Sequence, residues 1–174
     1  MAILKVFLIG YMGSGKSTIA KALSEITRIP AFDLDQAIEN RAGKSISEIF
    51  NEKGELQFRL LEHTVLKEMI DKPEAMILSW GGGTPCYANN HEFLSAENTK
   101  SIYLSASIST LFDRLKNQKE FRPLLANKTE DELKEYIAKN LFDRSYFYNQ
   151  ANFKINCDNK SIQEIVEEIL KILT

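Results

Sequence analysis

The stretch that decides the fold is GYMGSGKS at residues 10–17, which follows the apolar run ILKVFLI. Its glycines, lysine and serine match G-x-x-x-x-G-K-[ST], a loop whose backbone N–H groups surround phosphate oxygens when it joins a strand to a helix. The helix N-terminus adds a partial positive charge, and the lysine and serine can reach the terminal phosphates and a Mg²⁺ ion. The alternative is a glycine turn with an incidental lysine. The strand-loop-helix setting favours a nucleotide site, with these ATP-binding positions: Gly13, Ser14, Gly15, Lys16, Ser17 and Thr18.

Short apolar runs alternate with helical periodicities along the rest of the chain. We expect strands at 3–9, 31–35, 75–80, 100–105 and 151–157. We expect helices at 16–28, 36–53 (two pieces, broken near Gly43), 55–71, 88–97, 107–116, 129–148 and 161–173. This alternation is typical of an α/β fold, a parallel sheet with helices on both faces. No linker or repeat divides the sequence, so we expect one domain over 1–174.

The composition excludes several classes of protein. The 174 residues are 44% hydrophobic and 26% charged, with a net charge of −2, so we expect no nucleic-acid or membrane partner. Lys5 interrupts the first apolar run, no cleavage site follows it, and no stretch approaches the roughly 18 apolar residues of a membrane span. Cys86 and Cys157 have no metal-binding spacing and are expected to be free thiols. We expect a monomeric, cytoplasmic protein.

Two aspartates in FDLD follow the second expected strand. If the strand continues through them, Asp33 and Asp35 point to the same side at its carboxyl end, where such sheets bind ligands. Two close anions suggest a metal or proton-acceptor role. The alternative is that Asp35 only caps the next helix. The strand at 75–80 ends in ILSW without an acid, so Asp33 is a candidate to direct Mg²⁺, through metal-bound water.

Three further features are candidate binding elements. The run SWGGGTP at 79–85 exposes backbone donors suited to phosphate or substrate oxygens, or is simply a flexible turn. Arg59 and Glu62 share a helix face beside Phe58, which makes either a carboxylate receptor or a solvated ion pair. Residues 116–128 are irregular and carry four cations. They are either a lid at about 117–128 that delivers Arg122 to the transferring phosphate, or a solvated basic loop.

Taken together, GYMGSGKST, DLD, GELQFRLLE, SWGGGTP, FRPLL and DRSYFY resemble the shikimate kinase family over essentially the whole chain. The resemblance implies a nucleoside-monophosphate-kinase-like fold with a five-stranded parallel sheet and a substrate-binding helical region at about 35–62. It also implies ATP-dependent phosphorylation of the shikimate 3-hydroxyl, in the route to chorismate and aromatic amino acids, with Mg²⁺ as cofactor.

Carried over by motif, the resemblance assigns Asp35, Arg59, the backbone of Gly81, Gly82 and Gly83, and Arg144 to shikimate. It assigns Arg122 to the ATP phosphates and Arg114 to the neighbourhood of adenine. Lys16, Asp35 and Arg122 are then the expected catalytic residues, and Ser17 and Asp33 the expected metal positions.

The chain departs from the family pattern at two positions. Tyr146 stands two residues after Arg144, where the family usually has proline, and Trp80 is bulkier than the residue expected before the glycines. Two rival functions remain open. One is a kinase of another small hydroxy acid such as gluconate, which would not keep the triple glycine with both arginines. The other is a nucleotide-binding regulator, which would be expected to have lost Lys16, Asp35 or Arg122.

Overall fold

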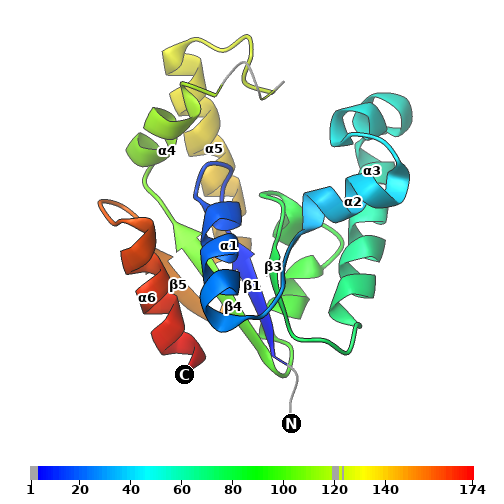
Figure 1. Cartoon of the computed structure of the whole chain (residues 1–174). Helices are drawn as coiled ribbons and strands as arrows, with labels where there is room; N and C mark the ends of the chain where they lie inside the picture. Colours follow the sequence, from blue (N-terminus) through cyan, green and yellow to red (C-terminus); the bar gives the residue numbers. More distant parts are fainter. Residues whose placement is uncertain (1–3, 119–121, 123) are drawn as a thin grey trace.

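One parallel sheet in the order β2-β3-β1-β4-β5 organises the computed structural model, which describes residues 4–118, 122 and 124–174 (Figure 1). The strands are β1 Lys5–Ile9, β2 Ala31–Asp33, β3 Met76–Ser79, β4 Thr99–Ser105 and β5 Phe153–Asn156. The helices are α1 Lys16–Thr27, α2 Leu34–Ala42, α3 Ile46–Ile70, α4 Ile108–Leu115, α5 Glu130–Tyr148 and α6 Ile162–Leu173, with short 3-10 helices η1 Thr84–Cys86 and η2 Asn90–Ser95. All neighbouring strands pair in parallel, which confirms the predicted fold class.

The central strand β1 is buried on both faces, because helices cover the sheet from each side. Val6 and Leu8 belong to an apolar layer with residues of α1 and α6, which lie on the near face in Figure 1. Phe7 and Ile9 belong to the opposite layer, with residues of α3, α4 and α5. A strand enclosed in this way needs apolar side chains on both sides, which explains the nearly continuous run in its sequence.

The order of the strands places the glycine-rich loop at a switch point of the sheet. From β1 the chain moves to β2 and β3 on one side, and later to β4 and β5 on the other. Ligands of such folds bind in the crevice beyond the carboxyl end of the strand where the order reverses. The loop after β1 borders that crevice, and the carboxyl ends of β2 and β3 lie at the same edge of the sheet (Figure 1).

The helical breaks predicted near Gly43 and before residue 55 are confirmed. Helix α2 ends at Ala42, followed by Gly43 at φ 68°. Helix α3 contains a non-helical residue, Gly54, at φ 81°, so that a short helix precedes the long one predicted from residue 55. These breaks let the α2–α3 pair stand beside the sheet, at the right in Figure 1.

Two local predictions are wrong. The segment 88–97 is not an α-helix but contains the 3-10 helix η2. The strand predicted over 31–35 ends at Asp33, because α2 begins at Leu34. Over the described ranges, none of the helices has the length and apolar character needed to cross a membrane.

Candidate active site

The glycine-rich loop is fixed at both ends. A Cβ on Gly10 would lie 2.7 Å from the carbonyl oxygen of Leu104, so only glycine lets the loop leave β1 this close to β4. Gly15, at φ 98°, begins α1, and its carbonyl accepts the first helical hydrogen bond, from Ile19 N at 2.9 Å. The loop therefore curls around the N-terminus of α1, where helical N–H groups are available to an anion.

Lys16 lies against this loop. Its Nζ donates to the carbonyl oxygens of Gly10, at 2.6 Å, and Tyr11, at 3.1 Å. Burial lowers the pKa of Lys16 to about 8, and the carboxylates of Asp35 and Asp33 oppose that shift. The ammonium is thus held at the floor of the site, where the effect of burial on its pKa outweighs the attraction of the two carboxylates.

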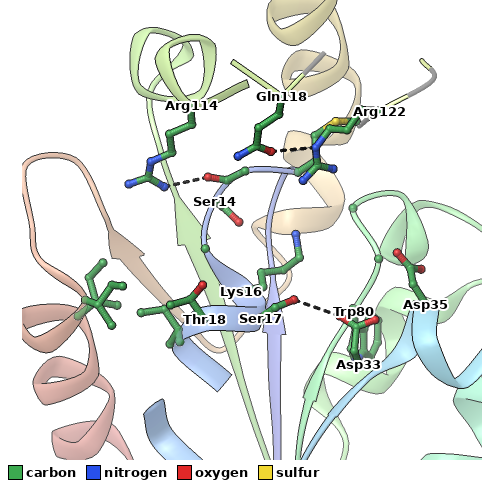
Figure 2. Close-up of a pocket in the computed structure, with 18 of the residues that line it drawn as sticks. Ser14, Lys16, Ser17, Thr18, Asp33, Asp35, Trp80, Arg114, Gln118 and Arg122 are labelled. Atoms are coloured by element: carbon green, nitrogen blue, oxygen red, sulfur yellow. Dashed lines mark hydrogen bonds between the residues drawn. The ribbon is translucent and has the colours of Figure 1, made fainter. Parts of the chain in front are cut away.

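A cavity of about 550 Å³ opens above the loop. It brings together most of the residues that the sequence singled out, drawn from α1, β2, α2, the glycine run and the α4 region (Figure 2). The predicted residues that line it are Gly13, Ser14, Gly15, Lys16, Ser17, Thr18, Asp33, Asp35, Gly81, Gly82, Arg114 and Arg122. Arg59, Gly83 and Arg144 are not among the residues that line this cavity, and the two arginines contact the glycine run, as described below.

Asp33 and Asp35 do not share one side of a strand, contrary to the prediction. Asp33 ends β2 and caps α2, since its Oδ1 accepts from Gln36 N at 3.0 Å. Its other oxygen, Oδ2, accepts from the hydroxyl of Ser17 at 3.1 Å (Figure 2). Asp35 lies in the first turn of α2 and is not the cap, so the capping alternative is wrong for this residue. The helical turn separates the two acids and gives them different neighbours.

Ser17 and Asp33 carry oxygen atoms of the kind that bind magnesium. Both residues offer hard oxygen atoms beside the phosphate-binding loop, which Mg²⁺ prefers. Residue 79, the strand-end neighbour of Asp33 in β3, is a serine whose hydroxyl donates to the Lys16 carbonyl at 3.3 Å. Among the described residues, no group of three or more His, Cys, Asp or Glu side chains is placed to hold a metal. The residues fit an ion held mainly by phosphates and water, with one or two protein oxygens.

Asp35 faces the glycine run. A Cβ on Gly81 would lie 2.9 Å from Asp35 Oδ1, so the missing side chain leaves room for this carboxylate. Burial raises the pKa of Asp35 to about 6, with further contributions from Asp33 and Glu62, while Lys16 opposes the shift. A carboxylate with this pKa is ionised at neutral pH and is still basic enough to accept a hydrogen bond or a proton from an alcohol.

Arg59 and Glu62 do not form a solvated ion pair. Nη1 of Arg59 donates to Glu62 Oε1 at 3.0 Å, and the side chain of Glu62 is only 1% exposed. The second carboxylate oxygen of Glu62 accepts from the hydroxyl of Thr84 at 2.8 Å. A Cβ on Gly83 would lie 2.8 Å from Nη2 of Arg59, so the guanidinium rests on the glycine backbone.

This network continues through residues that the sequence analysis missed. Thr84 C=O accepts from Asn90 Nδ2 at 3.0 Å, and Asn90 Oδ1 lies 2.6 Å from His63 Nδ1. Asn90 is fully buried. Nothing in the spacing of the sequence connects α3 with residues 84 and 90. The one available signal is the polar residues directly after the glycines.

Arg144 reaches the glycine run from α5. A Cβ on Gly82 would lie 3.3 Å from its Nη1, and its guanidinium carbon is 5.4 Å from the centre of the Tyr11 ring. Tyr148, one turn later, donates its hydroxyl to the Gly82 carbonyl at 2.5 Å. Gly82 is therefore held between two side chains of α5.

The two departures from the family pattern have different positions in the structure. Tyr146 is 65% exposed, so its side chain lies on the surface of α5. Trp80 is 1% exposed, packs against Phe7 with ring centres 5.2 Å apart, and lines the cavity. The tryptophan therefore contributes both to the core and to the cavity wall.

Two more arginines face the loop (Figure 2). Arg114 Nη1 donates to the Gly13 carbonyl at 2.8 Å, and Arg122 Nε donates to Gln118 Oε1 at 3.1 Å. The predicted lid at 117–128 falls partly on 119–121 and 123, which lie outside the described residues, Lys119 among them. Of the described part, Leu125 is fully buried in the core.

A phosphate-binding loop at a switch point, with a carboxylate of raised pKa and two arginines around one cavity, defines a P-loop kinase with a small acceptor site. Residues 12–174 match the protein-family model described as shikimate kinase. The chain belongs to the shikimate kinase family.

Individual relatives agree with this assignment. The shikimate kinase of Flavobacterium johnsoniae is 55% identical over 169 residues, covering 97% of this chain and 98% of that protein. The crystal structure of shikimate kinase from Bacteroides thetaiotaomicron has a TM-score of 0.91 at 38% identity, covering 98% of both chains. Shikimate kinase from Acinetobacter baumannii, solved in complex with shikimate, has a TM-score of 0.86 at 30% identity, covering 98% of this chain and 93% of that one.

A gluconokinase from Sinorhizobium meliloti has a TM-score of 0.64 at 16% identity, covering 98% of this chain and 91% of that one. At this identity the likeness shows a shared fold alone. It carries no argument for gluconate as the substrate.

Proposed function

We propose that this chain transfers the γ-phosphoryl group of ATP to the 3-hydroxyl of shikimate, giving shikimate 3-phosphate in the route to chorismate and aromatic amino acids. The observation that carries the proposal is the glycine run, whose three residues lie in turn against Asp35, Arg144 and Arg59. A hydroxyl acceptor and two carboxylate receptors thus meet along one run of three residues. This set of groups suits a small carboxylic acid that bears hydroxyl groups.

The phosphates of ATP bind the loop from Gly13 to Thr18. The loop N–H groups, Lys16 and Arg122 offset the negative charge of the transferring phosphoryl group. Arg114, whose guanidinium is held by the Gly13 carbonyl, lies on the side of the cavity assigned to adenine. The chain's contribution to phosphoryl transfer is chiefly alignment and charge neutralisation.

Asp35 receives the accepting hydroxyl. Its carboxylate orients the 3-hydroxyl toward the phosphoryl group and takes the proton from the hydroxyl oxygen as the new P–O bond forms. Arg59 and Arg144 bind the carboxylate of shikimate, and the backbone of Gly81, Gly82 and Gly83 surrounds the ring. Two arginines on one carboxylate fix which hydroxyl faces ATP.

Ser17 and, through water, Asp33 would hold Mg²⁺, which would supply positive charge beside the ATP phosphates. We further propose a cytoplasmic monomer that uses ATP and shikimate, with no nucleic-acid or membrane partner. The acidic net charge and the free thiols of Cys86 and Cys157 support this proposal.

The test is formation of ADP from ATP and Mg²⁺ in the presence of shikimate, with gluconate as the matched acceptor control. Rapid ADP formation with shikimate and background formation with gluconate supports the proposal. Turnover of gluconate alone would assign the chain to the rival kinase. ATP binding without turnover of either acceptor would favour the regulator.

The carboxylate receptor has its own test, in which shikimate is compared with its carboxamide on wild type and on Arg59→Ala. If Arg59 binds the carboxylate, the carboxamide is penalised in wild type and much less in the variant. Equal penalties in the two proteins would show that Arg59 does not contact that group.

A further inference from the structure

An aromatic ring covers the guanidinium of Arg59. The guanidinium carbon lies 3.9 Å from the centre of the Tyr87 ring and 5.1 Å from that of Phe58. Both distances are within the roughly 6 Å over which an aromatic face attracts a cation. Phe58 precedes Arg59 on α3, whereas Tyr87 comes from the segment after η1, 28 positions away along the chain.

Among the described residues, the hydrogen bonds of Arg59 use Nη1 and leave Nη2 as the donor for a ligand. Nη1 is taken by Glu62, and Nη2 lies beside Gly83. Nε is buried, makes no hydrogen bond to any described residue, and lies 3.8 Å from Glu55 Oε1. With Tyr87 over the plane of the guanidinium, an incoming carboxylate is confined to the edge of this group. A ring in this position also excludes water from the cation, which strengthens its attraction for an anion.

The backbone that carries Tyr87 is held in an unusual conformation. The carbonyl of Tyr87 accepts from Asn90 N at 3.0 Å, which closes a turn over residues 87–90. The two central residues, Ala88 at φ 52° and Asn89 at φ 55°, both have left-handed backbones. Asparagine tolerates this region, but alanine adopts it rarely. Asn90 is itself fixed by its bond to Thr84, so the turn is tied to the Glu62 network.

We propose that Tyr87 is a positioning residue for the substrate carboxylate: its ring holds the guanidinium of Arg59 in place and restricts its access to water. The proposal rests on the proposed function and adds a residue to it. Tyr87 acts through Arg59, and its ring, not its hydroxyl, provides the effect. Its side chain is 38% exposed, which is consistent with a cover at the rim of the site.

The test compares Tyr87→Phe, Tyr87→Leu and Tyr87→Ala with wild type, in initial-rate measurements and thermal unfolding. Phe142→Ala, on an aromatic residue that is 82% exposed on α5, is the matched control. We expect Tyr87→Ala and Tyr87→Leu to raise KM for shikimate by about five- to tenfold. We expect kcat and KM for ATP to stay within about twofold of wild type. Tyr87→Phe and Phe142→Ala should match wild type in all three constants.

The carboxamide of shikimate separates a positioning role from a purely structural one. The KM ratio of Tyr87→Ala to wild type should be about five to ten with shikimate and near one with the carboxamide. The same KM ratio with both compounds would overturn the proposal. A rise in KM for shikimate as large in Tyr87→Phe as in Tyr87→Ala would also overturn it. Tyr87→Leu keeps most of the bulk, so it remains informative if Tyr87→Ala unfolds. Failure of the proposed function would appear in wild type, as an absence of shikimate turnover.

Discussion

Gly83 and Arg59 are in a contact that leaves no room for a side chain: a Cβ on Gly83 would lie 2.8 Å from Nη2 and 3.2 Å from Nη1 of the arginine. The backbone of Gly83 has φ −93°, a value that every residue type can adopt. Space, and not backbone conformation, therefore requires glycine here. Position 83 must therefore be glycine because the side chain of Arg59, on α3, fills the space that a Cβ would need.

Gly83→Ala should fold normally and bind shikimate poorly. The new methyl group meets only the far end of a flexible side chain, so the guanidinium moves and the backbone does not. We expect a change in the free energy of unfolding below about 1 kcal/mol and a rise of tenfold or more in KM for shikimate. Urea unfolding and initial rates measure the two effects. A stable variant with the KM of wild type would show that the position of Arg59 is unimportant.

Asp35→Asn should be inactive and more stable than wild type at neutral pH. Burial raises the pKa of Asp35 to about 6, above its ordinary 3.8, so the folded state binds the proton more tightly than the unfolded state. The stabilising contribution is complete below about pH 4 and is lost as the pH rises through about 6. Removing the charge should therefore stabilise the protein by about 1–2 kcal/mol at pH 7.5 and have almost no effect at pH 4.

The same pKa sets an acid limb for catalysis. If Asp35 must be ionised to receive the hydroxyl, kcat/KM for shikimate falls about tenfold per pH unit below about 6. A profile that stays flat down to pH 5 would mean that its ionisation is not required.

Much of the fold could be predicted because the sheet is buried on both faces. The apolar runs at β1 and β3 have almost no polar alternation, and residues with helical periodicity follow each of the two strands. The phosphate-binding loop then fixed the edge of the sheet at which the site lies. The break predicted near Gly43 followed from glycine chemistry and is present as a left-handed residue at φ 68°.

The wrong or missing predictions have two causes. One is local competition between strand and helix-cap conformations, and the other is contacts between residues far apart in the sequence. Asp33 was expected to continue a strand, but an aspartate followed by a good helix sequence is also an N-cap, and the cap prevailed. The segment after the glycines has helical composition, but Ala88 and Asn89 are left-handed. The links from Glu62 to Thr84 and from Arg59 to Tyr87 join segments more than 20 positions apart, and one sequence holds no local signal for them.

Asp33→Asn should raise the Mg²⁺ requirement while leaving the fold intact. Asparagine caps helices about as well as aspartate, so the bond from Gln36 N to residue 33 is kept. The loss of one negative charge beside Ser17 weakens the attraction for the cation. We expect the Mg²⁺ concentration at half-maximal rate to rise about tenfold, with KM for shikimate changed by less than twofold. Superimposable Mg²⁺ titrations of the variant and wild type would assign Asp33 another role.

Lys16→Ala should abolish turnover with the fold retained, because the ammonium at the loop has no substitute. Burial holds the pKa of Lys16 near 8, so kcat/KM for ATP should fall as the pH rises through about 8. Bound phosphates favour the charged form, so the corresponding limb of kcat should lie at higher pH. Measuring kcat and kcat/KM for ATP as functions of pH checks both expectations. Identical limbs in the two profiles would indicate that another group titrates.

Arg122→Ala should lower kcat far more than it raises KM for shikimate. Arg122 lines the cavity beside the loop, and the bond from its Nε to Gln118 holds the guanidinium close to where the transferring phosphoryl group would bind. A charged contact that strengthens in the transition state contributes about 3–4 kcal/mol, or a few hundredfold in rate. Lys116→Ala is the matched control, since Lys116 lies in the same basic stretch and pairs with Asp113 at 3.4 Å. Steady-state kinetics of the two variants distinguish the two alternatives. Similar small losses of kcat in both variants would mean that Arg122 belongs to a solvated basic loop. A few-hundredfold loss of kcat confined to Arg122→Ala would place its charge at the reacting phosphate.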